Sequence, residues 1–120
     1  MTLNVDIWLR GQDFARTVSI EGITHEPRDW KDEDVKAVLE GMLRAMHRLK
    51  NPGEPDPPHI ALRGFSWIVN PYDDGGVVIA IEFTMGAAIA GPFDIDKTAL
   101  EQMITRVMSR TAAPSSSAIH

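Results

Sequence analysis

The residues most able to perform acid–base or metal chemistry are four histidines, and they are widely spaced. His25, His47, His59 and His120 stand 22, 12 and 61 residues apart, so no two have the spacing of zinc ligands on a helix. His25 is followed directly by Glu26, the one adjacent histidine–carboxylate pair in the chain. We expect this pair to lie in a surface loop, with acid–base or metal chemistry as the alternative.

Other catalytic patterns are missing from the sequence. The chain has no cysteine, which excludes disulfides, thiolate metal ligands and cysteine nucleophiles. It also lacks the Gly-x-Ser-x-Gly pattern of hydrolases and the glycine-rich phosphate-binding loop. Asp73 and Asp74 are expected to be turn residues rather than calcium ligands, because residues 75–78 add no carboxylate. We therefore expect no metal and no cofactor, and we favour a non-enzymatic role.

Length and composition are those of one acidic domain. The 120 residues include 17 acidic and 12 basic ones, giving a net charge of −5, whereas nucleic-acid binders usually present a basic face. No apolar run approaches the ~20 residues that a membrane helix needs, and residues 1–6 do not resemble a signal peptide. We expect a cytoplasmic protein that binds neither membrane nor nucleic acid, with a single domain over residues 1–111 and a flexible tail over 112–120.

Two β-hairpins are predicted from alternating apolar and polar side chains. The first covers residues 3–21, with a turn at residues 11–13. The second joins residues 59–69 to residues 77–84 through a turn rich in proline, aspartate and glycine. Residues 85–93 are ambiguous between an extension of the strand, a bulged edge strand and a loop.

Apolar residues at three- and four-residue steps predict two amphipathic helices. The first follows Trp30 and ends near Lys50, before a segment with four prolines in eight residues, 51–58. The second follows a cap at Asp94 or Asp96. Gly41 lies within the first helix, where a small residue would let another element pack closely. The predicted order is ββαββα. The predicted fold is an α+β domain with an antiparallel sheet of four or five strands and both helices on one face.

The second hairpin is apolar on both of its faces, and two helices on one sheet face cannot cover both. Trp8 lies on the polar face of the first strand, while Phe65, Trp67 and Val69 share one face of the third. Exposed apolar patches mark interaction surfaces. We expect these four residues to lie in an interface, unless residues 85–93 fold over them, and we expect Trp67→Ala to weaken association.

These observations favour a protein-interaction module that acts as a homodimer or binds another protein, such as an adaptor, a phage-associated protein or an immunity-type inhibitor. An acidic inhibitor of a basic nuclease would gain association rate from its charge. The alternative is a small-molecule binder or minor enzyme with a pocket near His25, Glu26, His59 and Trp67. Converging polar groups would favour the pocket, and a flat apolar sheet face would favour the module.

Overall fold

The computed structural model describes residues 3–57, 60–72 and 75–112. The amino-terminal segment, in which apolar and polar residues alternate, forms the predicted hairpin. β1 (Leu3–Leu9) and β2 (Arg16–Ile20) pair antiparallel. Every second side chain of β1, beginning with its first residue, is buried. One face of the hairpin therefore belongs to the core, as period-two patterns predict.

The first helix follows the hairpin and packs back onto it. A short 3-10 turn, η1 (Pro27–Asp29), leads into α1 (Asp32–Lys50), which contacts β2, β1 and β5. A Cβ atom built on Gly41 of α1 would lie only 2.9 Å from the Cδ1 atom of Ile20 in β2. The missing side chain at Gly41 thus permits the close approach between helix and strand that its small size suggests.

The ambiguous segment proves to be a central strand. β3 (Ser66–Pro71), β4 (Val77–Phe83) and β5 (Gly86–Phe93) complete an antiparallel sheet in which the described strands are ordered β2-β1-β5-β4-β3. The order of the described elements is therefore ββαβββα, with one strand more than the order ββαββα, and the five strands confirm the predicted sheet of four or five. β5 is neither an edge strand nor a loop, because it pairs with β1 on one side and β4 on the other.

The third strand begins and ends later than predicted. Its first residue is Ser66, and Asn70 and Pro71 belong to the strand rather than to the turn. The N–H of Tyr72 donates to the carbonyl of Gly76 at 3.0 Å, so alternation directs the backbone nitrogen of Pro71 to the free edge of the sheet. A proline can occupy that position because no neighbouring strand needs its missing donor.

The carboxyl-terminal helix, α2 (Lys97–Ala112), begins at the predicted cap. The Asp96 carboxylate accepts the N–H of Ala99 at 2.9 Å, which satisfies one of the free donors of the first turn. Ala112, the first residue of the predicted tail over 112–120, is the last residue of α2. Residues 113–120 lie outside the described residues.

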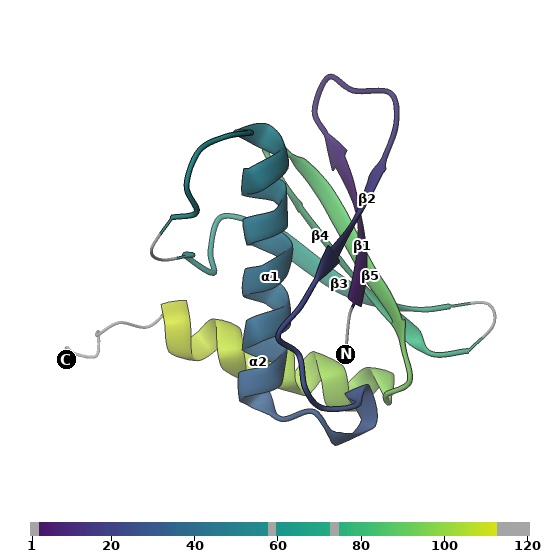
Figure 1. The fold of residues 1–120 in the computed structure, drawn as a ribbon. Coiled ribbons are helices and arrows are strands. Elements are labelled where there is room, and N and C mark those ends of the chain that lie inside the picture. The colour runs from purple at the N-terminus through teal and green to yellow at the C-terminus, as the bar shows by residue number, and fades with distance from the viewer. Residues whose placement is uncertain (1–2, 58–59, 73–74, 113–120) are drawn as a thin grey trace, which may run out of the picture.

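Both described helices lie against the same face of the sheet, as predicted (Figure 1). α2 packs on β3 and crosses α1, and together the helices cover one side of the sheet. The core between the two layers is apolar, and no buried polar or charged residue is found among those described. Within the same residues, no helix is both long and apolar enough to cross a membrane.

Replacing Ile81 by alanine tests which face of β4 is internal. Ile81 is 1% exposed beneath the helices, so Ile81→Ala should lower the free energy of unfolding by ~2–5 kcal/mol through lost burial and a cavity. Ile68 in the adjacent strand is 52% exposed, so the matched control Ile68→Ala should cost less than ~1 kcal/mol. Urea denaturation measures both, and equal losses would contradict the assignment of faces.

Candidate functional site

The face of the sheet opposite the helices, here called the open face, carries a row of apolar side chains. Side chains of residues paired across neighbouring strands lie on the same face, so the register identifies the members of each row. Ile68 of β3 is paired with Ala80 of β4, and Ala80 is paired with Ile89 of β5. The row continues to Asp6 of β1, which is paired with Ile89.

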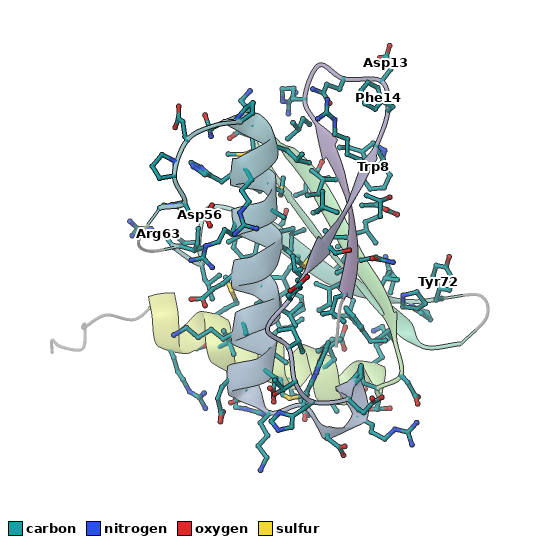
Figure 2. All side chains as sticks on the ribbon, viewed as in Figure 1. Trp8, Asp13, Phe14, Asp56, Arg63 and Tyr72 are labelled. Atoms are coloured by element: carbon teal, nitrogen blue, oxygen red, sulfur yellow. The ribbon has the colours of Figure 1, made fainter. Side chains whose placement is uncertain are left out.

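A second row runs beside the first. Ser66 of β3 is paired with Glu82 of β4, Glu82 with Ala87 of β5, and Ala87 with Trp8 of β1. Trp8 is 38% exposed and is directed away from α1 (Figure 2). The two rows together place five apolar side chains on adjacent positions of β1, β5, β4 and β3. We call this surface the apolar half of the open face; its members are Trp8, Ile68, Ala80, Ala87 and Ile89.

The part of the open face formed by β2 and the residues of β1 paired with it is polar and internally hydrogen-bonded. The hydroxyl of Thr17 in β2 donates to the Asp6 carboxylate at 2.6 Å. The hydroxyl of Ser19, also in β2, donates to the side-chain oxygen of Asn4 at 3.2 Å. These pairs suit a surface that faces water, so the open face divides into a polar half on β1 and β2 and an apolar half centred on β5 and β4.

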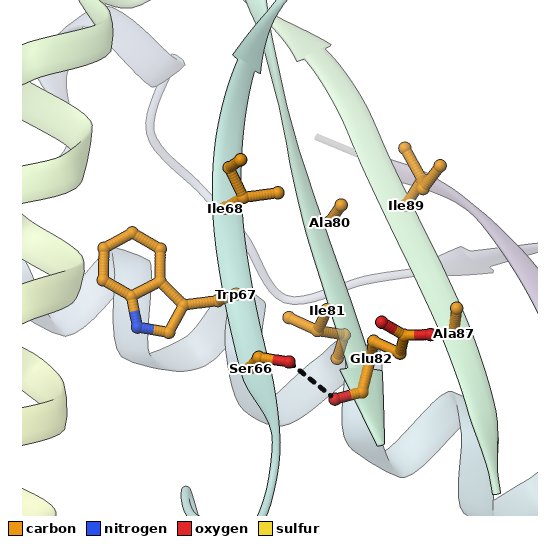
Figure 3. Close-up of a pocket in the computed structure, with 8 residues that line it drawn as sticks. All are labelled: Ser66, Trp67, Ile68, Ala80, Ile81, Glu82, Ala87 and Ile89. Carbon is orange, nitrogen blue, oxygen red and sulfur yellow. Dashed lines mark hydrogen bonds between the residues drawn. The ribbon is translucent and has the colours of Figure 1, made fainter. Parts of the chain in front are cut away.

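The apolar half contains a hollow with a volume of about 380 Å³. The short side chain of Ala80 leaves a shallow area between the longer side chains of Ile68 and Ile89, and Ala87 lies in the neighbouring row (Figure 3). The side chain of Glu82 lies beside Ala87 and supplies a carboxylate to the lining. Six of the residues that line the hollow have side chains on the open face: Ser66, Ile68, Ala80, Glu82, Ala87 and Ile89. Trp67 and Ile81 also belong to the lining, although their side chains are directed to the helices.

The structure separates the four residues predicted to share an interface. Trp8 lies on the open face, but Trp67 and Val69 are paired with core residues of β4 and face the helices. Val69 is 1% exposed, and Trp67 and Phe65 are half-buried against the core. Figure 3 shows the ring of Trp67 directed away from Ala80. Alternation in β3 separates two faces but does not say which is internal. The face with Trp67 and Val69 was predicted to be exposed, but it is the internal one, and the exposed Ile68 lies on the other face.

The predicted histidine–glutamate pair does not act as a pair. His25 Nδ1 lies 3.0 Å from Asp34 Oδ1 in α1, and the indole N–H of Trp30 donates to the His25 carbonyl at 3.0 Å. These contacts fix the loop to the start of the helix. Burial raises the pKa of Asp34, but hydrogen bonds from His25 and from the Lys31 N–H outweigh it, so the pKa of this carboxyl lies below its ordinary value.

The alternative pocket is not assembled by the described residues. The hollow includes Trp67 in its lining, but neither His25 nor Glu26. Both residues of the histidine–glutamate pair are exposed in the loop before α1, and His59 lies outside the described residues. In the described part of the chain, no group of three histidine, aspartate or glutamate side chains could hold a metal ion.

A cluster of one carboxylate and two guanidinium groups joins the two helices. Asp32, in the first turn of α1, accepts hydrogen bonds from Arg106 at 2.9 Å and lies 2.8 Å from a guanidinium nitrogen of Arg110, both on α2. The hydrogen bond from Arg106 is the main reason why the pKa of Asp32 lies below its ordinary value. The carboxylate and its two cations satisfy one another, which makes this cluster a structural link between the helices.

Replacing Trp67 by alanine distinguishes core from interface. Because its ring faces the helices, Trp67→Ala should lower the free energy of unfolding by ~2 kcal/mol, less than the full cost of a completely buried aromatic residue. The expected effect is a lower midpoint of urea denaturation. An unchanged midpoint together with weaker association would contradict this assignment and would show that Trp67 lies in an interface, as predicted from the sequence.

The link at Asp32 predicts a pH-dependent contribution to stability. A carboxyl whose pKa is lowered in the folded state stabilises the fold above its unfolded pKa, near 3.8, and loses this contribution as the pH falls through the folded value. Asp32→Asn should therefore cost ~1 kcal/mol at neutral pH and progressively less below pH ~4. Glu33→Gln, an exposed neighbour in the same turn, is the control. A cost independent of pH would show that the charge of Asp32 is not responsible.

Comparisons with known proteins add no functional information. No protein-family model, no curated protein and no solved structure matches the chain. A function for this protein therefore has to be inferred from the chemistry of its surfaces.

Proposed function

We propose that this chain is a non-enzymatic protein-interaction module and that the apolar half of the open face is its contact surface. The observation that carries the proposal is the row formed by Ile68, Ala80 and Ile89 on the face opposite the helices. Ile68, at the β3 end of this row, leaves 52% of its surface in water. Covering apolar surface with another protein removes it from water, which favours association.

The form of the surface supports a protein partner over a small molecule. Small-molecule sites are concave cavities in which several polar groups converge to orient the ligand. The hollow lies on a sheet face, and its only polar side chains are those of Ser66 and Glu82. An apolar surface with a polar border is instead the usual anatomy of a contact between proteins.

The proposal extends to the biological role and the compartment. A second copy of the chain or another protein could cover the apolar half, and the module would then act as a homodimer, an adaptor, a phage-associated protein or an immunity-type inhibitor. The lack of cysteine suits a reducing compartment, so we place the module in the cytoplasm.

A glutamate at position 68 tests the contact surface. Ile68→Glu places a charge on the β3 side of the apolar half, where a bound protein would bury it unpaired, and association should weaken by tenfold or more. Ser19→Glu introduces the same charge on the polar half and should have no such effect. Sedimentation velocity measures self-association, and affinity purification from the cells that produce the chain measures binding to other proteins.

The two variants decide the proposal together. The assigned surface is supported if the Ser19→Glu variant still self-associates or binds its partner and the Ile68→Glu variant does not. If the wild-type chain neither self-associates nor retains a partner, or if the Ile68→Glu variant binds as well as the wild type, the proposal is wrong. Circular dichroism of both variants shows whether each remains folded.

A further inference from the structure

We infer that the protein which covers the apolar half inserts an arginine side chain into the hollow. This inference rests on the proposed function, because it names the chemistry of the partner at the same surface. It combines two observations, which are the shape of the hollow and the single carboxylate in its lining.

The shape of the hollow fits a long side chain with an apolar stem. Ala80 lies between Ile68 and Ile89, and Ala87 lies beside Glu82, so the two alanines form the shallow floor of the hollow. Arginine and lysine bury their methylene groups along apolar surface while the charged end reaches a polar partner. A stem lying over the two alanines would cover apolar surface that the fold itself leaves in water.

The charge of the hollow selects a cation for the end of that stem. Glu82 is the only charged side chain in the lining, and no ion pair to its carboxylate is found among the side chains that the structure describes. The nearby Ser66 hydroxyl is directed to the Glu82 carbonyl, at 3.5 Å, and not to its carboxylate (Figure 3). A guanidinium matches a carboxylate with two parallel hydrogen bonds and is less strongly hydrated than an ammonium group, which favours arginine.

The same charge distribution argues against a second copy as the occupant. Two open faces in contact would bring the Glu82 and Asp6 carboxylates of both copies into one apolar contact, where like charges repel strongly. Arg10, the residue directly after β1, donates its Nε–H to the Thr84 carbonyl of the same chain at 2.8 Å. A basic protein meets no such repulsion, and the net charge of −5 would also accelerate its approach.

Peptides that differ only in one charge test the inference. The full chain, labelled with ¹⁵N, is titrated with the peptide acetyl-Ala-Ala-Arg-Ala-Ala-amide and with its citrulline counterpart, which has the same shape but no charge. The arginine peptide should shift the amide signals of Ile68, Ala80, Glu82 and Ala87 at millimolar concentration. The citrulline peptide should bind at least about threefold more weakly, as expected for the loss of a partly exposed ion pair.

A carboxylate variant locates the binding. Glu82→Gln should weaken binding of the arginine peptide by the same factor, because it removes the carboxylate that pairs with the guanidinium. Glu82 is exposed, so its replacement should leave the fold intact. Glu54→Gln, in an exposed loop, changes the net charge equally and should leave the affinity unchanged. Equal binding of the two peptides, equal losses in the two variants, or no shift at the hollow would overturn the inference. The substitution at Ile68 tests the contact surface separately, so a failed arginine test does not decide the proposed function.

Discussion

The pairing of β5 with β1 along one edge and with β4 along the other is the interaction on which the rest of the structure depends. It joins the two hairpins into a single sheet and sets their register. Alanine and glycine, which dominate β5, have low strand propensity, so the hydrogen bonds to both neighbours stabilise this strand more than its own side chains do. The same register directs Ala88 and Ala90 toward the helices and Ala87 and Ile89 toward the open face.

The layer arrangement then determines where apolar side chains remain in water. The described helices pack on one face of the sheet and on each other, so the described residues add no second layer on the opposite face. On β1 and β2 that face carries polar pairs such as Thr17 with Asp6. On β5, β4 and β3 it carries Ala80 and its apolar neighbours, with Glu82 as the single charge in the hollow. A function in binding, with a preference for a basic partner, is our proposal for this combination.

Local patterns predicted the elements of this fold better than the way they meet. The first hairpin, both helices and the cap at Asp96 follow from side-chain periodicity and hydrogen-bonding chemistry within a few residues. The position of β5 and the internal face of β3 depend on pairing between distant segments, which periodicity does not encode. Trp67 was therefore predicted in an interface, although its side chain faces the helices, and Ile68 was not identified as exposed. Glu82, the one charged residue of β4, marked the outer face of that strand, but only the register connects it to Ile68.

The central claim is that the apolar half of the open face is uncovered in the isolated chain. Attenuation of isoleucine methyl signals by a soluble nitroxide measures this most directly, because it reports the access of solvent to each side chain. The account predicts strong attenuation at Ile68 and almost none at Ile79 or Ile81, which are 0% and 1% exposed. Equal protection of Ile68 and Ile81 in a chain shown to be monomeric would contradict it, because part of the chain itself would then cover the open face.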